Sequence, residues 1–304
     1  MDPMPHAAML ANHSLTDERI RFFDENCYLA LRGLVTGELL ERLQKAAANW
    51  IDEGKRLGPG AEDHVWAKRE GGEALFRIDY LHDKGERASL ELLGAPQILG
   101  AVQSLLGPNF VPTYEAMVFK EQGDGQPIRW HQDVVHPRRH RIFNLDLYLD
   151  PSVSGAGALM VLPGSQTERL DACELERLHG WAPPGAIEVE MQPGDVLIHD
   201  VMVVHGSPRS VGKARRRTIY YEFRPAEQIL QEGPWDRSWV DRRLRLIPLG
   251  LRAHGERFPD ESPFVWQPDP EFRQAVEGTY EEELKIGHVV HTGGAYCSAS
   301  SAPA

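Results

Sequence analysis

Hydrophobic residues recur at helical spacing in the first third of the chain. This pattern predicts helices over residues 15–25, 36–54 and 96–106. A short apolar run at residues 28–35 predicts a strand between the first two helices. The segment 54–72 is rich in glycine and charge, which predicts a loop. The first third is therefore expected to be mainly helical.

Further along the chain the pattern changes to short runs rich in β-branched and aromatic residues, separated by glycine and proline turns. Their close succession predicts antiparallel pairing. The runs are residues 110–120, 141–149, 158–162, 186–191, 196–204 and 216–223. We therefore predict a mainly β, α+β fold, a double-stranded β-helix of the jelly-roll or cupin-like type. Such a barrel leaves one mouth open for a ligand.

A single domain over residues 1–304 accommodates these elements. Residues 15–107 are expected to form a helical N-terminal support, and residues 110–225 the jelly-roll core. Residues 226–304 form a C-terminal extension with a helical patch around residues 235–246.

Composition limits the kinds of partner. The formal net charge of the 304 residues is −12, whereas a surface for nucleic acid or anionic membrane would be basic. No stretch reaches the roughly 18 consecutive apolar residues of a membrane span, and the first residues lack a secretory signal pattern. We therefore expect a cytoplasmic protein without nucleic-acid or membrane partners. The three cysteines lie far apart, which predicts thiols instead of a disulfide or zinc framework.

Two potential metal ligands, His131 and Asp133, lie just ahead of the strand predicted over residues 141–149. Residues i and i+2 of a strand project from the same face, so the two side chains can converge while Gln132 points elsewhere. His205, at the end of an apolar run, is the third candidate ligand. Two imidazoles and one carboxylate leave the opposite positions of a metal open, as in non-heme iron(II) oxygenases.

Four other residues are rival ligands. His199 and Asp200 fall near the start of the strand predicted over residues 196–204, away from its far end, where the third candidate ligand lies. His136 and His140 lie among arginines, in a segment typical of a solvated cationic loop. We therefore prefer the histidine–aspartate–histidine set.

A basic cluster supplies a candidate anion site. Arginine suits a carboxylate because its planar fork donates two parallel hydrogen bonds, and a buried arginine needs an anionic partner. Strand alternation places Arg217 on the apolar packing side with Ile219, so Arg216 is the inward candidate. Ser207, two residues after His205, can donate its hydroxyl to the same carboxylate.

Together these motifs resemble the phytanoyl-CoA dioxygenase family of iron(II)- and 2-oxoglutarate-dependent oxygenases. The resemblance spans residues 15–225. It rests on His131-Gln132-Asp133, GALMVLPGSQ (157–166), PGDVLIHD (193–200), His205-Gly206-Ser207 and Arg216-Arg217. It implies that His131, Asp133 and His205 hold iron. It also implies that Arg216, eleven residues after the last ligand, binds the distal carboxylate of 2-oxoglutarate with help from Ser207.

The resemblance further implies that Met117, Arg77 and Asp146 face the cosubstrate. Asp146 departs from the family pattern, in which an aromatic residue is frequent at this position. The implied cofactors are Fe(2+), 2-oxoglutarate and O2. The implied reaction oxidises a C–H bond of a small-molecule substrate, most simply by hydroxylation, and forms succinate and CO2.

Two other classes of protein could use the same residues. One is a zinc- or manganese-dependent hydrolase, and the other is a ligand-binding barrel without catalysis. Arg216 disfavours the hydrolase, which has no need of a carboxylate-binding arginine beside its metal. An arginine-rich segment, with Arg138, Arg139 and Arg141, suggests an anionic substrate, although a solvated loop explains it equally well. The sequence leaves the identity of the substrate open.

Overall fold

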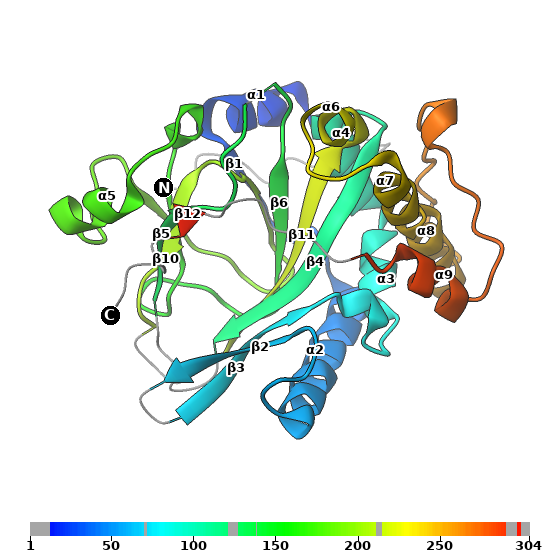
Figure 1. The fold of residues 1–304 in the computed structure, drawn as a ribbon, viewed down its shortest axis with the longest axis horizontal. Helices are drawn as coiled ribbons and strands as arrows, with labels where there is room; N and C mark the ends of the chain where they lie inside the picture. Colours follow the sequence, from blue (N-terminus) through cyan, green and yellow to red (C-terminus); the bar gives the residue numbers. More distant parts are fainter. Residues whose placement is uncertain are drawn as a thin grey trace.

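Two antiparallel sheets form the body of the protein (Figure 1). The computed structural model describes residues 13–69, 72–120, 127–137, 139–210, 215–289 and 297–298. The large sheet contains, in spatial order, β1 (Tyr28–Leu31), β9 (Val196–Asp200), β6 (Phe143–Tyr148), β11 (Arg216–Pro225), β4 (Phe110–Lys120), β3 (Gly72–Asp79) and β2 (His64–Arg69). The small sheet contains β12 (Cys297–Ser298), β5 (Ile128–Gln132), β10 (Val204–Ser207), β7 (Leu159–Leu162) and β8 (Ile187–Val189). The expected α+β fold with a jelly-roll core is confirmed.

Helices cover the outside of the large sheet. Figure 1 shows α2, α3 and the group α7 to α9 on one side of the molecule, and α5 beside the small sheet on the other. The helices are α1 (Asp17–Asn26), α2 (Gly37–Leu57), α3 (Ala88–Leu93), α4 (Pro96–Leu106), α5 (Ala172–His179), α6 (Ala226–Glu232), α7 (Arg237–Leu244), α8 (Leu246–Arg257) and α9 (Tyr280–Gly287). Short 3-10 turns are η1 (Leu81–Asp83), η2 (Ser165–Thr167) and η3 (Pro270–Phe272). Among the described residues, no helix is long and apolar enough to cross a membrane.

The large sheet has one apolar face and one polar face. One row of paired residues runs across five strands and belongs to the main hydrophobic core: Ile78, Met117, Ile219, Leu147 and Val196. All five are fully buried, and burial of each such side chain stabilises the fold by roughly 1.5–3 kcal/mol. The alternate residues of the same strands point to the other face, toward the small sheet. The cavity described below lies there.

The loop predicted over residues 54–72 was wrong. α2 continues to Leu57, and β2 follows at His64–Arg69, where it forms a hairpin with β3. β2 is an edge strand with no fully buried side chain at residues 64–68, and its apolar residues Val65, Trp66 and Ala67 are consecutive, so its sequence shows no alternation of apolar and polar residues. Gly54 does not end the helix. A Cβ there would lie 2.6 Å from Leu75 Cδ2, so the glycine allows α2 to approach the hairpin closely.

The expectation of a mainly helical segment over residues 15–107 was also incomplete, because β2 and β3 join the large sheet in addition to the predicted strand β1. The strand expected over residues 28–35 is shorter and ends at Leu31, before Gly33 adopts a φ of 57°. Beyond the barrel, the expected helical patch is present as α7 and the start of α8.

One apolar run proved to be two strands. Residues 196–204 were expected to form a single strand, but β9 ends at Asp200 in the large sheet and β10 begins at Val204 in the small sheet. Asp200 makes the turn between them, because its Oδ1 accepts a hydrogen bond from Met202 N at 2.8 Å. The run is buried throughout, including the polar pair His199-Asp200 at the break, and it contains no glycine or proline that would mark a turn.

Candidate metal centre

His131 and His205 lie directly opposite each other on paired strands of the small sheet. The register of β5 and β10 pairs these two residues, and their ring centroids are 4.2 Å apart. Asp133 follows the end of β5, and its backbone N–H donates to Val201 O at 2.9 Å. Gln132, between the two ligand candidates, points away and donates to Met202 O at 2.6 Å. The expected convergence of residues i and i+2 is present.

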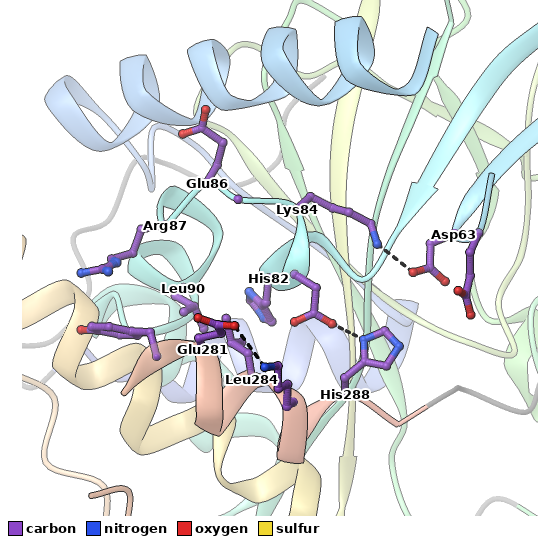
Figure 2. A pocket seen from close by; sticks show the side chains of 14 residues that line it. Asp63, His82, Lys84, Glu86, Arg87, Leu90, Glu281, Leu284 and His288 are labelled. Atoms are coloured by element: carbon purple, nitrogen blue, oxygen red, sulfur yellow. Dashed lines mark hydrogen bonds and ion pairs between the residues drawn. The ribbon is translucent and has the colours of Figure 1, made fainter. Parts of the chain in front are cut away.

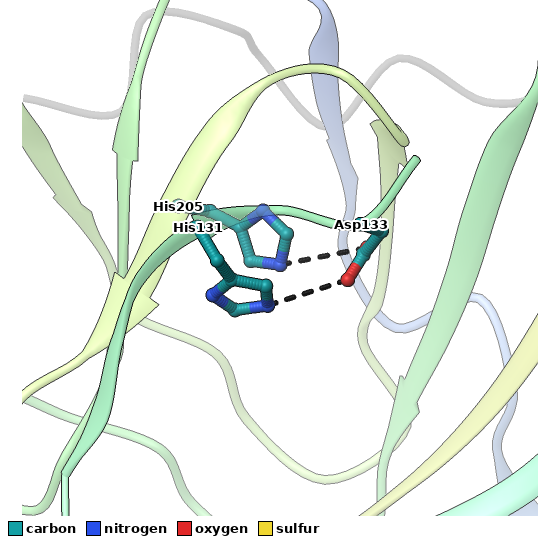
Figure 3. Close-up of side chains that lie close together, drawn as sticks. All are labelled: His131, Asp133 and His205. Atoms are coloured by element: carbon teal, nitrogen blue, oxygen red, sulfur yellow. Dashed lines mark ion pairs between the residues drawn. The ribbon is translucent and has the colours of Figure 1, made fainter. Parts of the chain in front are cut away.

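The three candidate ligands form a compact cluster (Figure 3). Their ligand atoms all lie within 4.8 Å of one another, and this is the one such cluster found in the described part of the chain. His131 Nε2 lies 3.3 Å from Asp133 Oδ1, and His205 Nε2 lies 3.6 Å from Asp133 Oδ2. A divalent metal with ligands at about 2 Å fits donors of this kind and spacing.

Backbone carbonyls orient both imidazoles. His131 Nδ1 donates to Arg129 O at 2.7 Å, and His205 Nδ1 donates to Val203 O at 3.0 Å. Each bond fixes the tautomer that leaves the Nε2 lone pair directed toward the centre.

Electrostatics acts differently on the three candidate ligands. Burial, together with the neighbouring imidazole of His131, lowers the pKa of His205 to about 3, so its ring is neutral at pH 7. Burial would raise the pKa of Asp133, but the charges and hydrogen bond of the two adjacent histidines outweigh it and lower this pKa. Asp133 and His205 are therefore present in the forms that bind a metal. Burial would lower the pKa of His131, but its hydrogen bond to Asp133 and the charge of that carboxylate outweigh burial and raise this pKa.

A further residue at the centre, Asn144, has no place in the predicted site. It is on β6 of the large sheet, and its Nδ2 donates to Asp133 Oδ2 at 2.7 Å. The alternation of polar and apolar residues along this strand places Asn144 on the cavity face. The sequence predicts this alternation, but it does not predict that the Asn144 amide binds the Asp133 carboxylate.

His199 lies close to the centre, in contrast to the prediction. Because β9 and β10 are separate strands, the ring centroid of His199 lies 4.6 Å from that of His205. Its Nε2 is directed at Asp146 Oδ2, 3.1 Å away. Burial would lower the pKa of His199, but the charge of Asp146 outweighs it and raises this pKa to about 9. A protonated imidazole paired with a carboxylate is not available to a metal.

The other rival ligands lie outside the cluster. Asp200 makes the turn between β9 and β10, and His140 Nε2 lies 3.4 Å from Gln231 Oε1. His136 is likewise not part of the cluster of ligand atoms.

The expected anion-binding residues lie together on the cavity side of the barrel. Arg216 and Ser207 are buried, and Arg216 Nη1 lies 3.1 Å from Ser207 Oγ. Arg216 also donates to the carbonyl of Gly157, and its Nε is buried without a hydrogen-bond partner. Arg217 points the opposite way and pairs with Asp150, Nε to Oδ2 at 2.8 Å. The predicted alternation of these two arginines is therefore correct.

The three residues suggested by resemblance alone have different positions. Asp146 and Arg77 line the cavity, and Arg77 Nε lies 2.8 Å from Asp79 Oδ1. Met117 does not line it. Its side chain belongs to the hydrophobic core on the other face of β4, while its neighbours Ala116 and Val118 face the cavity.

The cavity at the centre has a volume of about 560 Å³. Its walls carry the two histidines and Asp133, together with aromatic and polar side chains of the large sheet such as Tyr114, Tyr220 and Glu222. Burial raises the pKa of Tyr220, so its hydroxyl stays protonated and able to donate a hydrogen bond. The cavity is therefore large enough for a small organic molecule beside a metal.

A second cavity, of about 600 Å³, lies between η1, α3 and α9 (Figure 2). Its charged side chains pair with one another: Lys84 Nζ lies 2.7 Å from Asp63 Oδ2, and His288 pairs with Asp83. It contains no cluster of metal-ligand atoms among the described residues. We therefore place the candidate metal centre in the cavity lined by His131, Asp133 and His205.

A jelly-roll barrel with two histidines and one aspartate in its cavity defines the class of non-heme iron dioxygenases. Residues 23–218 match the phytanoyl-CoA dioxygenase (PhyH) family, and the chain belongs to this family. It is an iron(II)- and 2-oxoglutarate-dependent dioxygenase. The resemblance seen in the motifs is thereby confirmed.

Three relatives illustrate the similarity. Peroxisomal phytanoyl-CoA dioxygenase of Mus musculus is 24% identical over 70% of this chain and 70% of its own length. Ectoine dioxygenase of Sphingopyxis alaskensis is 22% identical over 85% of this chain and 92% of its own. Structures of EctD from S. alaskensis, solved with bound Fe and with 2-oxoglutarate and 5-hydroxyectoine, are 20% identical to this chain, with a TM-score of 0.61 over 79% of this chain and 88% of that one. AviO1 of Streptomyces viridochromogenes has a TM-score of 0.62 at 25% identity, covering 75% of this chain and 99% of that one.

Proposed function

We propose that His131, Asp133 and His205 hold iron(II), and that Arg216 and Ser207 bind the distal carboxylate of 2-oxoglutarate. The observation that carries this proposal is the convergence of three ligand atoms within 4.8 Å, with a buried, unpartnered guanidinium nitrogen of Arg216 on the same side of the barrel. An unpartnered buried guanidinium N–H is costly unless an anion accepts its hydrogen bond.

The bound iron and 2-oxoglutarate would supply the activation of O2 and the oxidation of a C–H bond, with succinate and CO2 as coproducts. The protein orients and shields these groups. Asn144 holds one oxygen of Asp133, and the carbonyls of Arg129 and Val203 hold the two imidazoles. Apolar side chains such as Ala116 and Val118 line the cavity beside them and limit the access of water.

The substrate is proposed to be a small molecule that is hydroxylated in the 560 Å³ cavity. The anionic character suggested by the arginine-rich segment finds little support. Arg141 pairs with Asp24 and donates to Leu105 O at 3.0 Å, outside the cavity, and Arg138 lies outside the described residues. Arg77 lines the cavity but is paired with Asp79. A neutral, hydrogen-bonding substrate suits these walls better, and a cytoplasmic location remains part of the proposal.

The test is the release of succinate by metal-stripped protein under defined additions. Iron(II) with 2-oxoglutarate should restore turnover, and zinc should not, because zinc has no redox chemistry. Arg216→Ala should raise the 2-oxoglutarate requirement roughly 30-fold or more. The matched control is Arg217→Ala, which loses the pair with Asp150 and should lower stability with little change in that requirement. Equal succinate release with zinc and with iron(II) would contradict the proposed redox role of the metal.

A further inference from the structure

A second cation lies beside Arg216. Lys120 is the last residue of β4, and the register of β4 and β11 places it directly opposite Arg216. Both side chains are buried, with 5% and 4% of their surface exposed. Strand alternation puts Lys120 on the same face as Ala116 and Val118, which line the cavity.

Both cations converge on one hydroxyl. Lys120 Nζ donates to Ser207 Oγ at 2.9 Å, and Arg216 Nη1 lies 3.1 Å from the same oxygen. Ser207 in turn donates to Gly157 O at 2.7 Å, and Lys120 Nζ also donates to Pro208 O at 3.2 Å. The ammonium, the guanidinium and the hydroxyl therefore form one continuous group of donors.

Gly157 leaves the space that this arrangement needs. A Cβ at this position would lie 3.2 Å from both Lys120 Nζ and Pro208 O, closer than most side-chain contacts, and in ordinary contact with Ser207 Oγ at 3.5 Å. Its φ of 78° is also one that other residues rarely adopt. The close approach of this backbone to both polar side chains therefore depends on glycine.

Two buried like charges repel each other, and an anion bound by both removes the repulsion. A carboxylate suits this place because its two oxygens offer about four acceptor sites. It can accept two hydrogen bonds from the arginine fork and one from the ammonium at the same time.

We propose that Lys120 is a second binding residue for the distal carboxylate of 2-oxoglutarate and makes the enzyme selective for a dicarboxylic 2-oxo acid. This inference rests on the proposed function of Arg216 and Ser207. Lys120 contributes charge, whereas Arg216 contributes charge and a fixed fork.

The test compares two ligands that differ only at the far end. Binding of 2-oxoglutarate and of 2-oxopentanoate, which carries a methyl group in place of the distal carboxylate, is measured anaerobically on the iron(II)-loaded protein. Lys120→Met should weaken 2-oxoglutarate binding about 10- to 100-fold and leave 2-oxopentanoate binding unchanged, since only 2-oxoglutarate has a distal carboxylate that can accept a hydrogen bond from the ammonium. Lys45→Met, at an exposed position on α2, is the control and should change neither affinity.

Lys120→Gln serves as a second variant, because it keeps a donor for the Ser207 hydroxyl but has no charge. Lys120→Gln should lose the preference for 2-oxoglutarate over 2-oxopentanoate to a similar extent as Lys120→Met. The inference is overturned if either variant keeps the wild-type preference, or if both ligands are weakened equally, which would indicate a structural role. If the wild type and Arg216→Ala bind 2-oxoglutarate equally poorly, the proposed function itself fails.

Discussion

Removal of the Asn144 amide should weaken iron binding without disturbing the fold. Asn144 Nδ2 donates to Asp133 Oδ2 at 2.7 Å, a hydrogen bond to a charged acceptor. Such bonds contribute about 1.5–3 kcal/mol, which corresponds to a loss of roughly 10- to 100-fold in affinity if the bond is needed to orient the ligand. Because β6 is paired on both sides, by β9 and β11, the backbone at Asn144→Ala should keep its position.

The assay is an anaerobic titration of the metal-stripped variant with iron(II), with the melting temperature measured in parallel. Asn49→Ala is the matched control: Asn49 also donates to a carboxylate, Glu86, but on the exposed surface, where such a bond contributes little. An iron(II) affinity of Asn144→Ala within twofold of the wild type, with normal melting, would refute the idea that this amide orients Asp133.

Two further predictions concern the same cavity. Replacing any one of the three candidate iron ligands by alanine (His131→Ala, Asp133→Ala or His205→Ala) should abolish succinate release. The far-ultraviolet circular dichroism should stay unchanged, because these side chains lie at the cavity and not among the core clusters. A variant with near-normal turnover would show that its residue is not a ligand. Gly157→Ala should raise the KM for 2-oxoglutarate several-fold with iron binding unchanged, because the added Cβ crowds Lys120 and Ser207 and the φ of 78° is strained. An unaltered KM for 2-oxoglutarate would contradict the placement of the carboxylate there.

The spacing of residues along a single strand predicted correctly which neighbouring side chains share a face. The i, i+2 relation of His131 and Asp133 and the opposite orientations of Arg216 and Arg217 follow from the two-residue period of a strand, and the structure has both. The succession of short strands and turns predicted the jelly-roll fold, and the resemblance added the cofactor and the cosubstrate. What it suggested for Met117 did not hold at the cavity, because strand alternation turns that side chain into the hydrophobic core.

The sequence concealed features that depend on pairing between distant segments. β2 lies at the edge of the large sheet, and its three apolar residues are consecutive instead of alternating with polar ones, so its sequence did not distinguish it from a loop. The turn at Asp200 lies within a run that is apolar on both sides, because both strands are buried. Asn144 and Lys120 could be placed on a face, but their partners, Asp133 and Ser207, come from the opposite sheet.

The two sheets supply different parts of the site, and this separation affects how substrate specificity can evolve. The candidate iron ligands come from neighbouring strands of the small sheet, β5 and β10, or directly follow them. The side chains that would meet a substrate, such as Asp79, Tyr114 and Glu222, come from the large sheet. Substitutions at these positions can therefore alter which molecule is accepted while the oxidation chemistry is inherited intact, provided that Asn144, Lys120 and Arg216 on the same sheet are kept.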